Sequence, residues 1–306
     1  MAIPTRPLGT TGEQVSILCL GGWHIGVPER DEAIRIVHRA VDSGITFLDN
    51  AWEYNDNESE RRMGDALAQG GYRQKSFLMT KNCAHDRKAS TSMTILEESL
   101  GRLKTDYLDL WQIHEVVWAD DPDRIFAPGG AAEAMLKAKE QGKVRYIGFT
   151  GHKSPAIFRR MFDLAPDFPW DTIQCPVNFA DWHYNSFQKE ILPLAAEKGI
   201  GVIGMKSLAA GALATETPIE PKEAIRYALS QNISSLCVGI DSMAILDQAL
   251  SIGEHFTPMS EQDQNRLRHL AFEHGWDGRH EKFKVSNDFE GPLGRIDHGM
   301  PLATQG

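Results

Sequence analysis

The sequence predicts an α/β protein folded as a (β/α)8 TIM barrel, with an N-terminal β-hairpin, a C-terminal helix and an extended C-terminal tail. Short apolar runs alternate with amphipathic stretches, and each strand–helix pair takes roughly 30 residues, the size expected for this fold. The apolar runs are continuous rather than alternating, as is typical of parallel strands covered by helices. We expect a single domain over residues 1–306, with the barrel core at about 17–253.

Eight apolar runs are the expected barrel strands. They are residues 17–20, 45–49, 77–81, 108–114, 144–149, 172–177, 201–206 and 235–240. A doubly wound dinucleotide-binding sheet is the competing fold, but no GxGxxG motif follows any of these runs. The segment 199–207 is not a Walker A motif either, because Met205 separates its last glycine from Lys206. The barrel is therefore the better prediction.

Helical periodicity occupies several of the intervals between these runs. Apolar residues recur at helical spacing in 31–43, 91–103, 185–198 and 243–252. Asp31 is a candidate N-cap for the first of these helices. A glycine that ends a helix in the left-handed conformation is expected just past three helices, at Gly44, Gly142 and Gly199.

Three segments lie outside the repeat. Residues 4–16 combine turn residues with short polar stretches and are expected to form a hairpin that closes the barrel floor. Residues 260–274 look helical. The tail 275–306 has no periodicity, so it is either disordered or an extended cover over the barrel mouth.

Composition indicates a small-molecule partner. The net charge of −10 argues against binding to nucleic acid or to an anionic membrane surface. No apolar run approaches the roughly 20 residues that cross a bilayer, and no export signal is recognisable, so we expect a cytoplasmic monomer or homo-oligomer. The cysteines form no CxxC pair and are expected to be buried thiols; they are Cys19, Cys83, Cys175 and Cys237.

Four chemically complementary side chains fall at the ends of three consecutive predicted strands. Asp49 ends the second strand and Tyr54 follows in its loop, while Lys81 ends the third strand and His114 the fourth. Active sites of such barrels lie at the carboxyl ends of the strands. Each residue alone is more often a cap, a rim residue or a packing residue. Their joint occurrence on neighbouring strands predicts one catalytic corner.

This set suits hydride transfer between a carbonyl and an alcohol. Reduction forms an alkoxide that must be protonated, and a Tyr54 hydroxyl can do this if a neighbouring ammonium, Lys81, stabilises its phenolate. Asp49 would keep Lys81 charged and oriented. His114 can donate a hydrogen bond that polarises the carbonyl oxygen. Run backwards, the same groups oxidise an alcohol.

The sequence resembles the aldo-keto reductase superfamily at these positions. Segment 44–67 is similar to the family's second-strand signature, with matching residues at Asp49, Ala51, Tyr54, Ser59, Glu60 and Gly64. Lys81 and His114 match the rest of its catalytic tetrad. The opening segment 6–16 resembles the family's N-terminal hairpin, and the likeness extends to about residue 253. The resemblance implies an enzyme, an oxidoreductase that uses NADP or NAD.

The resemblance also implies cofactor contacts. Thr150 and Gln174 stand where the family holds the nicotinamide carboxamide, with Asn178 as scaffolding. Met205 replaces an aromatic residue that stacks on the nicotinamide, and Lys206 stands where serine is common and could reach the pyrophosphate. Further cofactor contacts are expected at Gly22, Trp23, Asp49, Ser207, Leu208, Gly211, Gly239, Asp241 and Gln248.

The sequence after the eighth strand departs from the family's NADP-preferring members. Gly239 and Ile245 occupy the positions of the Lys and Arg that clasp the 2′-phosphate, and Asp241 adds a negative charge nearby. A carboxylate there would repel a phosphate and could accept a hydrogen bond from a free 2′-hydroxyl. We therefore expect use of NAD, or of both cofactors.

Aromatic and histidine residues gather on the loops of the predicted mouth. They are Trp23, His24, Trp52, Trp118, His152, Trp182 and His183. Such a set suits a polar substrate such as a sugar, although several members could be only rim packing. The expected substrate contacts are Trp23, His24, Trp52, His114 and His152.

Two rival functions use the same residues differently. A metal-dependent hydrolase or isomerase barrel could hold an ion with histidines at strand ends, namely His24, His114, His152 and His183. The sequence lacks an HxH pair on the first strand, and a metal-dependent barrel would leave the Tyr–Lys–Asp set unexplained, so no metal is expected. A non-catalytic cofactor-binding redox sensor is the second rival, and the intact tetrad argues against it.

Overall fold

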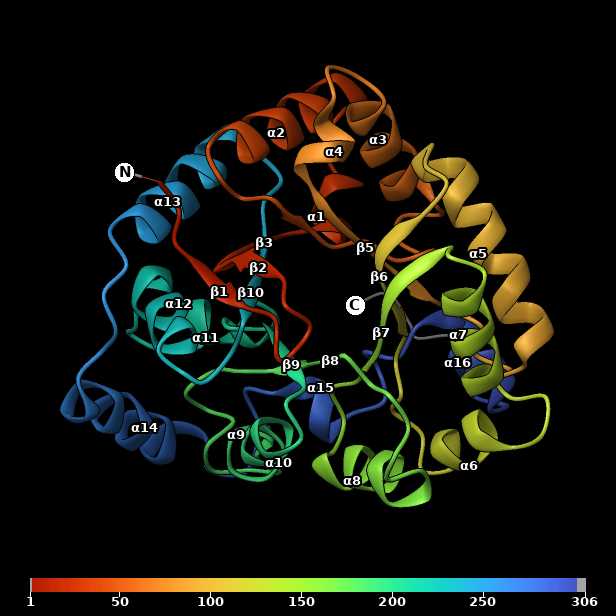
Figure 1. Cartoon of the computed structure of the whole chain (residues 1–306). Helices are drawn as coiled ribbons and strands as arrows, with labels where there is room; N and C mark the ends of the chain where they lie inside the picture. The colour runs from red at the N-terminus through yellow and green to blue at the C-terminus, as the bar shows by residue number, and fades with distance from the viewer. Residues whose placement is uncertain (1, 302–306) are drawn as a thin grey trace.

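The computed structural model describes residues 2–301 and has a closed barrel of eight parallel strands at its centre (Figure 1). In hydrogen-bonded order round the barrel, the strands are β10 (Ser235–Gly239), β3 (Leu18–Gly21), β4 (Phe47–Leu48), β5 (Phe77–Asn82), β6 (Leu108–Ile113), β7 (Val144–Thr150), β8 (Thr172–Pro176) and β9 (Gly201–Met205). Each expected run overlaps one strand, and every boundary agrees within two residues. The (β/α)8 prediction is confirmed.

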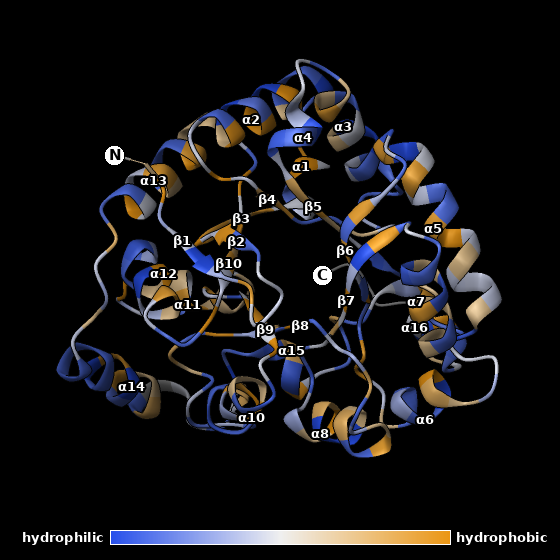
Figure 2. Cartoon of the chain, in the orientation of Figure 1, coloured by the Kyte–Doolittle hydropathy of each residue, from blue (hydrophilic) through white to orange (hydrophobic). Residues whose placement is uncertain are grey.

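Helices cover the outside of the barrel (Figure 1). They are α1 (Gly22–Ile25), α2 (Arg30–Asp42), α3 (Glu58–Leu67), α4 (Tyr72–Lys75), α5 (Ala89–Leu103), α6 (Asp121–Phe126), α7 (Ala131–Glu140), α8 (Pro155–Leu164), α9 (Phe187–Glu190), α10 (Leu192–Glu197), η1 (Ala209–Gly211), α11 (Ala212–Glu216), α12 (Pro221–Leu229) and α13 (Met243–Glu254). Figure 2 shows hydrophobic and hydrophilic residues mixed along these helices. In α2 the buried residues include Ile36, Val37 and Ala40, which form the face turned to the barrel.

Two local expectations were wrong. Helix α2 begins at Arg30 with Glu29 as its N-cap residue, so Asp31 lies in the first turn rather than at the cap. The expected helix 185–198 is two short helices, α9 and α10, and Pro193 lies in the first turn of the second, where its missing N–H is tolerated. The three helix-ending glycines do have positive φ, at 98° for Gly44, 70° for Gly142 and 70° for Gly199.

The hairpin closes the amino end of the barrel. Strands β1 (Thr5–Pro7) and β2 (Gln14–Ser16) pair antiparallel, as expected. Leu8 and Val15 are fully buried and belong to the same cluster as the inward-facing Phe47, Leu110 and Ile203. Because the floor is plugged, a ligand must enter at the other end, where the carboxyl ends of the strands lie. Within residues 2–301, none of the helices combines the length and apolarity that a membrane span requires.

The C-terminal segment forms α14 (Glu261–Gly275), α15 (Lys282–Val285) and α16 (Pro292–Asp297). The tail after α14 is therefore partly helical rather than wholly extended. Its backbone N–H at Gly291 donates to Glu115 Oε2 at 2.7 Å, and the His298 ring stacks on Trp118 with centroids 4.2 Å apart. Both partners follow β6, so the tail covers the mouth, which was one of the two expectations. Residues 302–306 lie outside the described part of the chain.

Candidate active site

Lys81 is the centre of a buried polar group at the ends of β4 and β5. Its ammonium forms an ion pair with Asp49 and donates to the carbonyl oxygen of Asn50 at 2.8 Å and to the Tyr54 hydroxyl at 3.2 Å. Lys81 is 1% exposed and Asp49 3% exposed. The three donors of the ammonium are thus all satisfied, and one of them is directed at the tyrosine.

Burial dominates the electrostatics of this group. It raises the pKa of Tyr54 above its ordinary value, although the charge of Lys81 partly opposes that rise. Burial alone would lower the pKa of Lys81, but the charge and hydrogen bond of Asp49, together with Tyr54 and Cys237, more than offset this effect, so the pKa of Lys81 is raised. At neutral pH the site therefore holds a charged lysine and a protonated tyrosine.

The loop after Tyr54 is held in an uncommon backbone conformation. Asn55, Asp56 and Asn57 have φ values of 52°, 53° and 70°, and Asn and Asp tolerate this left-handed region better than most residues. The hydroxyl of Ser59 donates to the carbonyl oxygen of Gly22 at 2.5 Å, which ties this loop to the end of β3. The residues at 55–57 thus suit the turn that follows Tyr54.

His114 follows β6 and lies beside the tyrosine. The two rings meet edge to face with centroids 5.7 Å apart. Its main-chain carbonyl accepts a hydrogen bond from Arg87 at 2.8 Å, and Arg87 forms a fully buried ion pair with Asp121, Nε to Oδ1 2.7 Å. The structure therefore brings together all four predicted catalytic residues, although Asp49 reaches the others only through Lys81.

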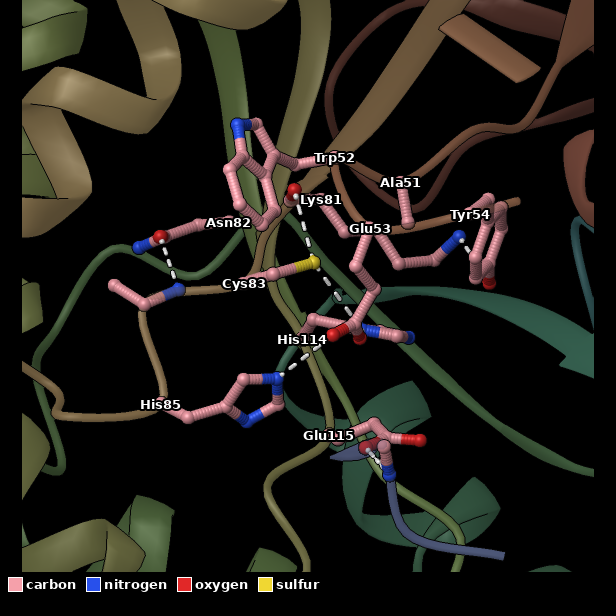
Figure 3. Close-up of polar contacts among 12 residues, drawn as sticks. Ala51, Trp52, Glu53, Tyr54, Lys81, Asn82, Cys83, His85, His114 and Glu115 are labelled. Atoms are coloured by element: carbon pink, nitrogen blue, oxygen red, sulfur yellow. Dashed lines mark hydrogen bonds and ion pairs between the residues drawn. The ribbon is translucent and has the colours of Figure 1, made fainter. Parts of the chain in front are cut away.

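Sequence reasoning missed three residues that surround His114. Glu53 Oε1 lies 2.7 Å from His114 Nδ1, and Glu53 Oε2 lies 3.2 Å from His85 Nε2 (Figure 3). Glu115 is the third, and one ligand atom from each of these four residues lies within 4.8 Å of the others. Such groups can bind a divalent ion. In this structure Glu53 is hydrogen-bonded to both histidines, and Glu115 accepts a hydrogen bond from the Gly291 N–H. The available signal was adjacency, since Glu53 precedes Tyr54 and Glu115 follows His114.

The four histidines considered for a metal barrel do not meet. His24 packs over Gly239, where an added Cβ would lie 2.2 Å from its ring. His152 is buried edge-on against Phe283, with centroids 5.8 Å apart, and the ring of His183 bonds the carbonyl oxygen of Arg268 at 2.7 Å. Only His114 lies in the tetrad.

The ends of β7, β8 and β9 carry polar groups that fit a nicotinamide cofactor. Thr150 and Gln174 are paired neighbours, 2% and 1% exposed, and Gln174 Oε1 is buried without a hydrogen-bond partner in residues 2–301. Such an orphaned acceptor suits a carboxamide N–H. Among the described residues Lys206 forms no ion pair; its ammonium lies 5.1 Å from the centroid of the Phe283 ring. The side chain of Asn178 is taken up by Glu281 and by local backbone N–H groups, as expected of scaffolding.

The other expected cofactor positions lie round the same rim. An added Cβ at Gly22 would meet the Asp49 carbonyl oxygen at 2.3 Å, so only glycine fits there. Met205 and Lys206 are half-buried at the end of β9, and Ser207, Leu208 and Gly211 follow in the next loop. Gly239, at the end of β10, is exposed, and so are Asp241 and Gln248 beyond it.

The expected substrate residues are divided between two places. Trp23 is 51% exposed at the rim beside His24, with ring centroids 5.0 Å apart. Trp52 instead donates its indole N–H to Glu98 of α5 at 2.7 Å, so its polar edge faces away from the tetrad. His152 Nε2 is buried and has no hydrogen-bond partner in the part of the chain that the structure describes, which leaves a polar atom for a ligand.

Comparison with known proteins agrees with this geometry. Residues 17–277 match the aldo/keto reductase family. L-galactose dehydrogenase of Arabidopsis thaliana is 28% identical over 283 residues, which cover 80% of this chain and 86% of that protein. A 6-dehydroglucose reductase of Novosphingobium aromaticivorans is 34% identical over 166 residues, 50% of this chain and 53% of that protein. The holo form of an aldo-keto reductase from Bacillus halodurans superposes with a TM-score of 0.73 at 23% identity, over 88% of this chain and 96% of that one.

Proposed function

Since the chain belongs to the aldo/keto reductase family and is an oxidoreductase that uses NAD or NADP, we propose that Tyr54 is its proton donor and acceptor in the interconversion of a carbonyl and an alcohol. The observation that carries the proposal is the 3.2 Å contact between the Tyr54 hydroxyl and the buried Lys81 ammonium. No other tyrosine in the described chain has a buried ammonium at its hydroxyl.

Each of the four residues has a different role in the proposed proton transfer. The bound cofactor supplies or takes the hydride at its nicotinamide ring. Tyr54 is a protonated phenol before reduction and gives its proton to the substrate oxygen as negative charge develops there. Lys81 stabilises the phenolate that remains, and Asp49 keeps that ammonium charged inside a buried site. His114 lies beside Tyr54 and contacts the same substrate oxygen.

Other residues of the rim are proposed to bind the cofactor. Thr150 and the unpartnered Gln174 Oε1 hold the carboxamide, and Lys206, which has no ion pair in the described chain, meets the pyrophosphate. Asp241, exposed beyond β10, favours a free 2′-hydroxyl over a phosphate. We therefore propose that NAD binds at least as tightly as NADP.

A sugar or a related polyhydroxy compound is the proposed substrate. Two relatives are named for sugar chemistry, L-galactose dehydrogenase and 6-dehydroglucose reductase. The exposed Trp23 face and the unpartnered His152 Nε2 offer one apolar and one polar contact of the kind that a sugar uses.

The test is a screen of aldehydes, ketones and sugars with both cofactors, followed by nicotinamide absorbance. On the best substrate, Tyr54→Phe is expected to lower kcat by about 10²–10⁴-fold because the proton relay is lost. Tyr107→Phe is the matched control: Tyr107 is 36% exposed, and the change should leave kcat unaltered. Turnover by Tyr54→Phe within a few-fold of the wild type would contradict the proposed role.

A further inference from the structure

We propose that Glu53 is a positioning residue that holds the proton of His114 on Nδ1, so that Nε2 meets the substrate as a hydrogen-bond acceptor. The inference rests on the proposed function, because it specifies how His114 contacts the substrate oxygen. It also changes what the tetrad selects: the neutral site accepts a hydrogen bond from a hydroxyl and gives none to a carbonyl.

The contacts of the His114 ring are one-sided. In the described chain, every polar contact of the ring is made at Nδ1, with Glu53 Oε1 at 2.7 Å and Cys83 Sγ at 3.4 Å. Figure 3 shows the other ring nitrogen pointing away from Glu53 and His85, on the side where Tyr54 lies. Nε2 is therefore the atom left for a ligand.

The carboxylate decides which atom carries the proton. Burial alone would raise the pKa of Glu53, but the hydrogen bonds with His114 and His85 lower it, so this side chain is ionised. An ionised carboxylate only accepts, and Nδ1 must then be the donor. Cys83 is a weaker hydrogen-bond partner for Nδ1 than Glu53 is. Burial raises the pKa of its thiol, so the sulfur stays protonated and is only a weak acceptor, and the thiol also lies 3.6 Å from the Lys81 carbonyl oxygen, to which it can donate.

Other groups support this arrangement from each neighbouring element. His85 binds the second oxygen of Glu53 from the loop after β5, which keeps the carboxylate from turning away. Arg87 holds the His114 and Glu115 carbonyl oxygens at 2.8 and 2.7 Å. From the tail, Gly291 lies so close that an added Cβ would be 3.3 Å from both Glu53 oxygens. His85, Arg87 and the tail at Gly291 thus restrict the movement of the Glu53–His114 pair.

A fixed tautomer has a direct chemical consequence. A neutral imidazole with its proton on Nδ1 has a lone pair on Nε2, and this atom can accept from an alcohol. A carbonyl has no proton to give, so it gains a hydrogen bond from His114 only when the ring is protonated on both nitrogens. The class of ligand that the neutral site recognises is therefore the alcohol, such as a sugar hydroxyl.

The direct test is the tautomer of His114 in the full chain, read from long-range ¹⁵N–¹H NMR correlations of ¹⁵N-histidine-labelled protein. A His114→Asn sample identifies its signals among the 11 histidines. We expect the wild-type ring to be neutral and protonated on Nδ1 at mildly alkaline pH. A proton on Nε2 in the wild type overturns the proposal, and this result needs no cofactor and no substrate.

Variants add a readout that a merely structural role would not move. Glu53→Met keeps the side-chain length but removes the acceptor, and the proton should shift to Nε2; Glu115→Gln, in the same cluster but not bonded to the ring, should leave it on Nδ1. Glu53→Met should raise the KM of the alcohol about tenfold, as one lost hydrogen bond costs, and should lower the KM of the carbonyl, because Nε2 then carries a proton that the carbonyl oxygen can accept. An equal rise for both overturns the proposal. A wild-type enzyme that never turns over defeats only the proposed function, because the tautomer is measured without turnover.

Discussion

The two sides of the barrel mouth differ in how completely their charged groups are paired. At the ends of β4, β5 and β6, the buried charges are paired: Lys81 with Asp49, and Glu53 with two imidazoles. At the ends of β8, β9 and β10, Gln174 Oε1 has no partner, Lys206 has no ion pair among the described residues, and Asp241 is exposed. On the first side the charged groups hold one another, although Asn50 Nδ2 and His85 Nδ1 have no hydrogen-bond partner among the described residues. The second side keeps the Gln174 acceptor and the Lys206 ammonium for a ligand.

Under the proposed function, this difference assigns proton transfer to the first side and cofactor binding to the second. Electrostatic preorganisation is effective when the groups need no rearrangement as charge develops, and that describes the side with Tyr54 and Lys81. A buried polar group without a hydrogen-bond partner destabilises the fold unless a ligand supplies the hydrogen bond, and Gln174 Oε1 is such a group. Changes on the first side should therefore affect turnover or folding, and changes on the second should affect cofactor affinity.

The largest effect is expected from dismantling the Lys81 pair. The double variant Asp49→Asn/Lys81→Met removes both charges together, so no unpaired ion is left in the core. Turnover should fall about 10³-fold because the Tyr54 phenolate loses its counter-ion. Steady-state kinetics measures kcat, and cofactor fluorescence should show binding within a few-fold of the wild type. A kcat within a few-fold of the wild type would mean that Lys81 is only structural.

Arg87 tests whether the frame that holds His114 is as rigid as its contacts indicate. Arg87→Met leaves Asp121 as an unpaired, fully buried charge and should lower the free energy of unfolding by about 3–5 kcal/mol. Urea unfolding measures it. Arg35→Met is the matched control, because Arg35 is exposed and pairs with Glu32 on the surface, where the expected loss is below about 1 kcal/mol. Equal losses for the two variants would show that the buried pair stabilises no more than a surface pair.

The anchor of the tail beside β8 should make stability depend on pH. Burial raises the pKa of Glu281 from 4.5 to about 7 although Lys284 lies beside it, because Asp181 shares that ammonium. Between these values the folded chain binds a proton that the unfolded chain has released. The stability that this proton contributes is therefore fully present below about pH 4.5 and is lost as pH rises through about 7, a loss of roughly 3 kcal/mol.

Glu281→Gln isolates that contribution. The amide keeps an oxygen for the Asn178 N–H, at 2.9 Å in the wild type, but it does not titrate. Urea unfolding at about pH 5 and about pH 8 should show a smaller loss of stability with rising pH in the variant than in the wild type. An identical loss in both proteins would mean that Glu281 is ionised throughout this window.

The smallest expected effect is at Asp241. Asp241→Asn removes an exposed negative charge from the end of β10 and should tighten NADPH about three- to tenfold relative to NADH. Fluorescence titration with both cofactors at low salt measures the ratio. Asp247→Asn, an exposed carboxylate on α13 paired with Arg39, is the control. A ratio that does not move would place the adenosine 2′ position away from Asp241.

Much of this arrangement was predictable from sequence, and the missed part has a physical reason. The barrel followed from apolar runs and helical spacing, and the tetrad followed because strand ends of a parallel barrel converge. Glu53, His85 and Glu115 were missed because their loops have no periodicity, and only the fold brings His85 to the carboxylate beside Tyr54. Trp52 was expected at the substrate, but its indole N–H binds Glu98, a partner on a helix that sequence spacing cannot place.

The most direct test of the division between the two sides separates cofactor binding from hydride transfer in one variant. Tyr54→Phe should bind the reduced cofactor as the wild type does in a fluorescence titration. In a stopped-flow single turnover, the same variant should oxidise the bound cofactor at least about 10²-fold more slowly with the best carbonyl substrate. Hydride transfer at the wild-type rate, or loss of cofactor binding with no change in the rate from saturated enzyme, would contradict the account.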